Sequence, residues 1–278
     1  MIALKRRRSA RDVPASFRRP KLLGAAKKLI KLYYDARTSG TFAFASSAWK
    51  PAKSALKKDS FDKCAYCEAP TAIVAHGDVE HFRPKSVYWW LAFCFDNYLY
   101  SCQICNQTHK GDRFPTLAAI LPAPEMPAVK PAGAALDALA TSLVVDAVVA
   151  TDAQLLAAWS AEEADLINPY LEDPEPLLAY EPDDANQEMW LRSAGGVRAD
   201  RAVRAAHDVL GANRQELLRA RYAMYLTFAA FKVILQAQVP DAVRAIALQE
   251  FRRMQAVSEP FAGMRRYFAR TWGLPGPV

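Results

Sequence analysis

The sequence lacks the features of a secreted or membrane-spanning protein. Its first residues are rich in Lys and Arg, but they include no apolar segment of the kind that a secretory signal needs. The most apolar window, residues 132–150, is interrupted by Asp137 and Asp146, which argues against a membrane span. No internal repeat is present. We therefore expect a cytoplasmic protein that does not associate with a membrane.

Cysteine is scarce, and its placement is informative. Four of the five cysteines form two Cys-x2-Cys pairs, Cys64 with Cys67 and Cys102 with Cys105. In a reducing cytoplasm such pairs favour metal binding over disulfides. Each pair can form a turn that directs two thiolates at one ion, so we predict a structural Zn²⁺ site. An iron–sulfur cluster or a redox dithiol would leave the equal spacing unexplained, and Cys94 is expected to fill a buried apolar site.

The rest of the composition is that of an ordinary globular protein. Of the 278 residues, 52% are hydrophobic and 23% are charged, enough for one large domain or two modest ones. We expect residues 214–236 to form a central core helix, with Asn213 as its N-cap and Gly211 ending the helix before it. Asp241 is expected to cap the following helix. The predicted helices are 18–37, 46–63, 200–210, 214–236, 242–255 and 260–272, and residues 177–181 are a predicted strand.

The net charge of +7 is distributed unevenly. Residues 5–31 hold eleven Lys and Arg against one acidic residue, and residues 201–278 hold twelve against five. Residues 121–200 hold fifteen acidic residues against three basic ones. Phosphate is the natural counter-charge for the two basic regions, although each can also be solvated surface. The acidic middle should repel nucleic acid, so we expect it to face solvent or a partner.

The segment between the two cysteine pairs contains the residues best suited to chemistry. Glu80 and His81 stand where a short apolar run meets Pro84, as on a strand that enters a turn. Asn106 directly follows Cys105, as at the start of a helix that leaves a zinc knuckle. A metal at the cysteines would bring a carboxylate, an imidazole and an amide oxygen together. Hydrolysis of a phosphodiester needs oxygen ligands for a divalent cation and an imidazole that accepts a proton from water.

This pattern resembles a known nuclease family. The matching elements are Cys64-x2-Cys67, Glu80-His81-x2-Pro84, Asn97, and Cys102-x2-Cys105-Asn106 with Lys110. They resemble the HNH, or His-Me finger, endonucleases, and more narrowly the zinc-ribbon members of bacterial anti-phage systems of the Septu and retron-associated types. The sequence around these motifs resembles that subgroup over about residues 60–182, and the later segment "VLGANRQELLRAR" resembles it loosely.

The resemblance implies a ββα-metal fold and a role for each matched residue. His81 would be the general base, Glu80 and Asn106 would hold a catalytic Mg²⁺ or Mn²⁺, and Asn97 would fix the metal loop. Many family members have Asp before the histidine where this chain has Glu. Asp78 would share a face of the strand with Glu80, so either carboxylate can be the ligand. The resemblance further implies a partner ATPase that licenses cutting.

Other polar and aromatic residues have weaker roles. Lys85, Lys110 and Arg113 are candidate phosphate contacts. His76 and His109 are expected to make local contacts or face substrate, and His207 is distant in sequence. The tryptophans Trp89 and Trp90 are expected in the core.

These observations predict a mainly α protein with a small embedded ββα-metal module held by a four-cysteine zinc site. The expected regions are a basic helical arm (1–60), the zinc module (61–120), an acidic Pro-rich connection with a short strand (121–199) and a helical C-terminal region (200–278). The predicted function is metal-dependent HNH cleavage of nucleic acid in anti-phage defence, with DNA favoured over RNA. The alternatives are an inactive zinc-ribbon adaptor that binds nucleic acid and a toxin that cuts tRNA. An adaptor would have no need to keep a base and metal ligands together.

Overall fold

The computed structural model describes residues 1–71 and 76–277. Helices hold about half of the chain, and the strands pair into two separate antiparallel hairpins, β1 with β2 and β3 with β4. No helix in these residues is both long and apolar enough to cross a membrane. The main elements are α1 (Lys21–Ser39), α2 (Lys53–Asp59), β1 (Asp78–His81), β2 (Tyr98–Ser101), the π-helix η6 (Ile104–Lys110), α3 (Gly133–Leu143), α4 (Asp152–Trp159), β3 (Leu178–Asp183), β4 (Glu188–Ser193), α5 (Val197–Leu210), α6 (Gln215–Gln236), α7 (Asp241–Arg253) and α8 (Ala262–Thr271). The short 3₁₀ turns are η1 (Ala15–Phe17), η2 (Ser46–Ala48), η3 (Lys50–Ala52), η4 (Trp89–Leu91), η5 (Phe95–Asn97) and η7 (Ser160–Glu162).

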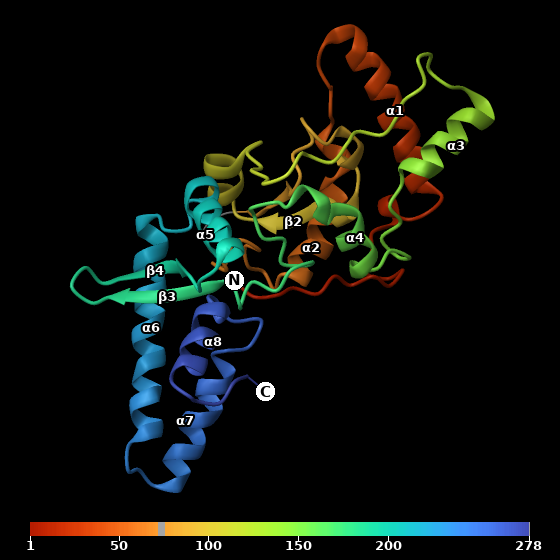
Figure 1. Cartoon of the computed structure of the whole chain (residues 1–278). Coiled ribbons are helices and arrows are strands. Elements are labelled where there is room, and N and C mark those ends of the chain that lie inside the picture. The colour runs from red at the N-terminus through yellow and green to blue at the C-terminus, as the bar shows by residue number, and fades with distance from the viewer. Residues whose placement is uncertain (72–75, 278) are drawn as a thin grey trace.

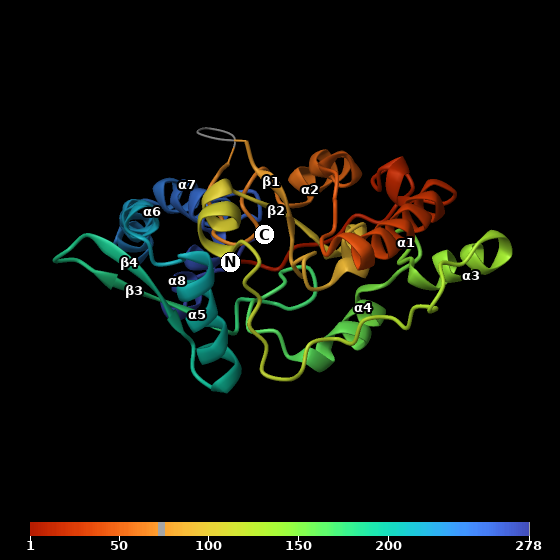
Figure 2. The same ribbon diagram turned by 90° about the horizontal axis from the view of Figure 1, so that it is seen from above.

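The β1–β2 hairpin lies between two groups of helices (Figures 1 and 2). On one side α3 packs against α1, and α2 packs against the hairpin itself. On the other side the β3–β4 hairpin contacts α5, α6 and α8. The pair α6 and α7 extends away from the rest of the molecule (Figure 1). The segment between η6 and α5 is therefore shared between the two groups of helices. Its first helix, α3, packs on α1, and its last part, the β3–β4 hairpin, packs on the C-terminal helices.

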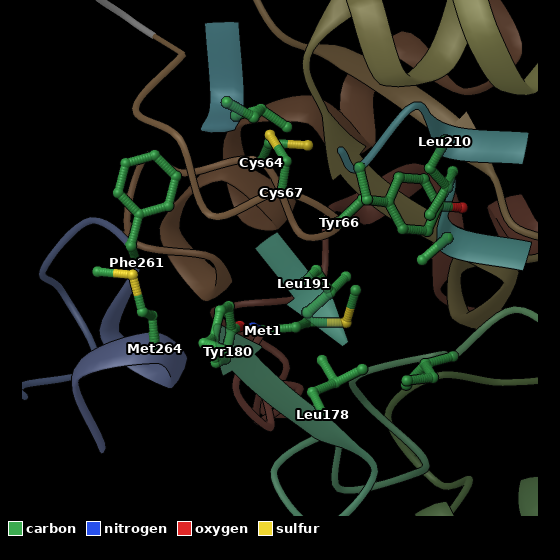
Figure 3. Packing of buried hydrophobic residues seen from close by; sticks show 14 of the residues in the cluster. Met1, Cys64, Tyr66, Cys67, Leu178, Tyr180, Leu191, Leu210, Phe261 and Met264 are labelled. Carbon is green, nitrogen blue, oxygen red and sulfur yellow. Dashed lines mark hydrogen bonds between the residues drawn. The ribbon is translucent and has the colours of Figure 1, made fainter. Parts of the chain in front are cut away.

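The largest hydrophobic core joins the cysteine region to the C-terminal half of the chain. Tyr66 and Leu99 from the cysteine region share this core with Leu191 of β4 and Phe268 of α8. Figure 3 shows Cys64, Cys67 and Tyr66 next to the buried side chains of the β3–β4 hairpin. A metal that fixes the cysteines would therefore also fix the edge of this core.

Several predicted elements are confirmed with small shifts in their ends. The first long helix begins after Pro20, and α5 ends where Gly211 adopts the left-handed conformation (φ 59°). The strand predicted at 177–181 is β3, and its partner β4 was not predicted. Trp89 and Cys94 are buried, as expected, and Trp90 is partly buried against the same clusters.

Four helix predictions are wrong. The segment predicted as one helix at 46–63 is divided among η2, η3 and α2, which ends at Asp59. Asn213 does not cap α6: its side chain accepts from the backbone N–H of Leu191 at 2.9 Å and donates to the carbonyl of the same residue at 3.1 Å. Asp241 does not cap α7, which follows Pro240 without a side-chain cap. The helix α6 is not central, because Leu226 is 51% exposed and Val233 is 66% exposed. Its apolar composition gave no information about which side would be covered.

Many carboxylates of the acidic middle segment form ion pairs with basic side chains, and several of them face solvent at the same time, as expected. Some of these carboxylates reach the N-terminal and the C-terminal basic regions, which the sequence did not indicate. The pairs are Asp137 with Lys27, Asp146 with Arg19, Asp152 with Arg8, Glu162 with Arg83, Glu163 and Asp165 with Arg201, Glu172 with Arg198, Glu175 with Arg266 and Arg270, and Glu181 with Arg192.

Part of the N-terminal basic arm is likewise structural. The guanidinium of Arg6 is buried, donates to the carbonyl of Tyr98 at 2.7 Å and lies 3.7 Å from the ring centre of Tyr170. Arg7 bonds to Asp59 at 2.8 Å. Arg6 therefore holds the arm against the hairpin, and Arg7 holds it against α2; the buried guanidinium of Arg6 is not free to meet phosphate.

Candidate functional site

The four cysteines of the two Cys-x2-Cys pairs meet at one point. Cys64 and Cys67 lie on the turn after α2, and Cys102 and Cys105 lie where β2 leads into η6. Their sulfur atoms all lie within 4.8 Å of one another, and the sulfurs of Cys67 and Cys102 are 4.0 Å apart. Four thiolates around Zn²⁺ at about 2.3 Å need sulfur–sulfur separations of about 3.8 Å. The donor set and its spacing therefore fit a tetrahedral zinc ion.

Neighbouring donors face the sulfur atoms. A guanidinium N–H of Arg214 donates to the sulfur of Cys105 at 3.6 Å, and the backbone N–H of Cys105 lies 3.4 Å from the sulfur of Cys102. The hydroxyl of Ser101 is 3.6 Å from the sulfur of Cys64. Such donors stabilise thiolate charge and orient the ligands. Sequence reasoning gave Arg214 no role, although it lies within the loosely matching "VLGANRQELLRAR".

The loop between β1 and β2 is clamped by Asn97. Its side-chain oxygen accepts from the backbone N–H of Arg83 at 2.9 Å, and its amide donates to the carbonyl of the same residue at 2.9 Å. The backbone N–H of Phe82 also donates to the carbonyl of Asn97 at 2.9 Å. Asn97 is fully buried. These bonds hold together the two ends of the loop that follows His81.

His81 ends strand β1 with its ring buried against aromatic side chains. Its Nε2 lies 3.0 Å from the carbonyl oxygen of Ala92, and the rings of Trp49 and Tyr98 meet it edge to face. A carbonyl only accepts, so Nε2 carries the proton and Nδ1 keeps its lone pair. Burial lowers the pKa of His81 to about 4. The imidazole is therefore neutral at pH 7 and able to accept a proton.

Glu80, the residue before His81, forms a buried ion pair with Lys110. The ammonium of Lys110 lies 2.6 Å from the Glu80 carboxylate and donates to the carbonyl of His81 at 3.0 Å. Burial raises the pKa of Glu80 to about 7, and the nearby Lys110 opposes this shift. The carboxylate predicted to bind a cation thus already has a cationic partner.

Asp78 is the carboxylate next to Asn106. The side-chain amide of Asn106 donates to Asp78 at 3.4 Å, and that of Gln107 donates to the same oxygen at 2.7 Å. The antiparallel register pairs Asp78 with Ser101 and Glu80 with Leu99. Residues two apart on a strand share a face, so both carboxylates lie beside η6. Asp78 and Asn106 are thus the carboxylate and amide that the structure brings together most directly.

These groups line one groove with a volume of about 420 Å³. Its walls combine hydrogen-bonding groups from β1 and η6 with a basic rim from Lys50, Lys53 and Lys85. The ammonium of Lys85 lies 5.5 Å from the ring centre of Trp49, which also lines the groove. Asp78, Glu80, His81, Asn106, Gln107 and Asp112 supply the acidic, imidazole and amide groups.

The three candidate phosphate contacts have different surroundings. Lys85 lines the groove beside His81. Lys110 is fully buried in its pair with Glu80, so its ammonium does not face the groove. Arg113 donates to the carbonyls of Asp208 and Val209 at the end of α5, which is a structural role.

The remaining histidines lie outside the groove. His76 is exposed, and the ring of His109 packs directly over Gly211. A side chain at Gly211 would collide with that ring, since a Cβ there would lie 2.4 Å from it. His207 is exposed on α5.

Sequence reasoning missed the groups that support the loop after His81. Arg83 donates to Glu162 at 2.6 Å, and the hydroxyl of Tyr88 donates to the same carboxylate at 2.6 Å. Glu162 is completely buried. The missing information is the pairing of residues far apart in the chain, which no local motif reveals. Lys50 and Lys53, in contrast, lie in a basic segment next to Trp49, so the sequence could have indicated them as candidate phosphate contacts.

Comparison with known proteins gives one partial match. The chain is 37% identical over 87 residues to the Septu protein PtuB of Bacillus mycoides (strain KBAB4). The match covers 27% of this chain and 30% of that relative, so less than a third of the relative's length is shared. No protein-family model matches the chain.

Proposed function

We propose that this chain is a metal-dependent HNH endonuclease that hydrolyses phosphodiester bonds in nucleic acid, with DNA favoured over RNA. The observation that carries the proposal is the state of His81. Its imidazole is neutral, its Nε2 proton is directed to the Ala92 carbonyl, and it lines a groove with carboxylates, an amide and lysines. A fixed neutral imidazole is the group that a water nucleophile requires as a base.

The chain's own residues divide the work as follows. Nδ1 of His81 accepts a proton from the attacking water, and Asn97 keeps the loop behind it in place. Lys50, Lys53 and Lys85 balance the charge of the phosphodiester backbone. The four-cysteine zinc site fixes β2 to η6 and so positions Asn106.

The groove's oxygen donors suit a hard divalent cation such as Mg²⁺ or Mn²⁺. Asp78, Glu80 and Asn106 would hold it, and all three line the groove. When bound, the cation would stabilise negative charge on the scissile phosphate and the leaving oxygen. Glu80 can contribute only if the cation competes with Lys110.

The biological setting is part of the same proposal. The partial similarity to the Septu protein PtuB and the resemblance to zinc-ribbon HNH proteins support a role in anti-phage defence. We propose that cutting occurs in a defence complex, with a partner ATPase as the expected regulator.

One observation favours a second candidate function. The ammonium of Lys110 already neutralises the carboxylate of Glu80, which is one of the expected metal ligands. A chain in which this pair is permanent would bind nucleic acid as an inactive zinc-ribbon adaptor.

Incubation of the purified protein with plasmid DNA and with RNA separates these functions. We expect cleavage with Mg²⁺ or Mn²⁺ and none with EDTA. His81→Ala should reduce the rate by about 10²–10⁴-fold and leave zinc content and binding unchanged. The control is His207→Ala, which removes an exposed histidine. Equal rates for His81→Ala and the parent would contradict the proposal, and binding without cutting by the parent, with the partner added, would favour the adaptor.

Asn106→Ala tests the cation separately from the base. Weaker cation binding can be offset by mass action, so excess Mn²⁺ should partly restore its activity. The same addition should not restore His81→Ala, because a cation cannot accept a proton. Rescue of both variants to the same extent would contradict the assigned roles.

A further inference from the structure

A second groove lies on the other side of the short turn η2 from the His81 groove. Its volume is about 670 Å³. One wall is α1, which contributes Lys21, Lys28 and Lys31, and the opposite wall is the segment that includes Ala45, Ser47 and Ala48. We call it the α1 groove.

The three lysines form a single basic stripe. They are separated by seven and three residues, which places them on the same side of a helix with 3.6 residues per turn. All three are exposed. Lys31 pairs with Asp35, but that pair is solvent-exposed on both sides and so contributes little to stability. Lys21 and Lys28 form no ion pair within residues 1–71 and 76–277.

The acidic middle segment neutralises other cations of the same region and leaves this stripe uncovered. Lys27, one helical turn before Lys31, pairs with Asp137 of α3, and Arg19 pairs with Asp146 at 3.7 Å. These two carboxylates of the middle segment are thus used by cations that do not belong to the stripe. The α1 groove keeps a net positive charge, because Asp35 pairs only with Lys31 and no carboxylate of the described residues pairs with Lys21 or Lys28.

The α1 groove and the His81 groove meet at one ridge. Ser47 and Ala48 line the first, and Ser46 and Trp49 line the second. The crest of the ridge consists of small exposed residues, Ala45, Ser46 and Ser47. A chain of phosphates that crosses this crest passes over small side chains. Beyond it lie Lys50, Lys53 and Lys85 beside His81.

We propose that the α1 groove is a second nucleic-acid site, which holds the phosphodiester backbone of the same strand whose cleavage site lies at His81. The inference rests on the proposed function for the chemistry at His81 and adds the path of the substrate. The stripe recognises phosphate rather than base edges, so it predicts affinity and dependence on strand length without sequence preference. DNA and RNA share this backbone chemistry.

The test compares two triple variants that remove the same charge. Lys21→Gln/Lys28→Gln/Lys31→Gln removes the stripe, and Lys5→Gln/Lys58→Gln/Lys130→Gln removes three exposed lysines elsewhere. All six lysines are exposed, so both variants should fold, which circular dichroism checks. Lys28→Glu alone is a milder change that should act in the same direction.

Binding of labelled single-stranded and duplex DNA and RNA, from about 4 to about 16 nucleotides, is measured without added Mg²⁺ or Mn²⁺ over a range of salt concentrations. For long strands the stripe variant should lower the salt slope of log K by about 2, since each phosphate contact on a single strand contributes about 0.7. The shortest strands and the control triple should keep the parent slope. An unchanged slope for long strands, an equal loss in the control, or a parent that binds no oligonucleotide would overturn the α1 groove site.

Cleavage of the long strands with Mn²⁺ is measured in parallel on the same proteins. If the parent cuts and the stripe variant keeps its salt slope, the substrate path fails and the nuclease stands. If the parent does not cut and the slope still falls, the nuclease fails and the binding groove stands. If the stripe variant lowers the salt slope only for DNA or only for RNA, the result supports the α1 groove site and identifies the sugar that the groove accepts.

Discussion

The ammonium of Lys110 lies 2.6 Å from the carboxylate of Glu80, and both side chains are almost completely buried. The same ammonium donates to the carbonyl of His81. Lys110 therefore connects η6 to the end of β1 and balances a charge that burial would otherwise make costly. Any divalent cation that binds Glu80 has to compete with this lysine.

Lys110→Met removes the ammonium and keeps the length of the side chain. We expect the free energy of unfolding to fall by about 3–5 kcal/mol, because Glu80 then loses its partner. Mn²⁺ should stabilise this variant more than it stabilises the parent, since the carboxylate becomes available to the cation. Denaturation with and without Mn²⁺ measures both effects. Lys85→Met, at the half-buried lysine of the groove, is the control. An equal Mn²⁺ effect on parent and variant would show that Glu80 is not a cation ligand.

The cysteine cluster should contain one zinc ion per chain, as metal analysis of the purified protein can determine. Because metal affinity in such a site is folding free energy, Cys64→Ser or Cys102→Ser should lose the zinc and unfold the central region. Cys94→Ala is the matched control: this cysteine is buried in another hydrophobic cluster, so its loss should leave the zinc in place. A metal-free protein with the parent's thermal stability would rule out a structural zinc.

The sequence was most informative where a feature depends on residues close together in the chain. The two Cys-x2-Cys turns, the strand end at His81 and the stop at Gly211 are local, and the structure has all three. Features that depend on distant partners were missed. Nothing near His81 shows that the carbonyl of Ala92 fixes its proton, and nothing near Lys110 shows that Glu80 neutralises it.

The charge pattern illustrates the same limit. Counting charges correctly separated two basic regions from an acidic one, but it could not show that they neutralise each other. Arg8 pairs with Asp152, and Arg201 pairs with Asp165. Which basic side chains of the described residues remain without an ion pair depends on how the helices pack, as for Lys21 and Lys28 of α1. It does not follow from the number of charges in each region of the sequence.

Arg6 tests whether the start of the basic arm serves stability or nucleic-acid binding. Its guanidinium is buried between Asp59 and Tyr170, so Arg6→Met should destabilise the fold by several kcal/mol, about 3–5 if the pair behaves like other broken buried pairs. Arg11→Met, at an exposed arginine of the same arm, should change the free energy of unfolding by less than about 0.5 kcal/mol. Urea denaturation measures both. A small effect for Arg6→Met would return this residue to the set of candidate phosphate contacts.

The buried imidazole of His81 should make stability depend on pH in a defined direction. Its pKa is lowered from 6.5 to about 4 in the folded chain. Between these values the unfolded chain binds a proton that the folded chain does not, so the free energy of unfolding falls as the pH falls. Glu80 has the opposite effect, because its pKa is raised from 4.5 to about 7 and its folded form gains the proton first.

His81→Gln separates the two effects, since it keeps a donor for the Ala92 carbonyl and leaves Glu80 in place. The advantage of the parent over this variant should shrink by about 2 kcal/mol between pH 7 and pH 5, the amount that a pKa lowered to about 4 implies. Denaturation of both proteins at the two pH values gives the difference, in which the contribution of Glu80 cancels. A parent whose advantage is the same at both values has a histidine that titrates normally. In that case the imidazole would keep its ordinary pKa in the folded chain, and the conclusion that burial lowers the pKa of His81 would be wrong.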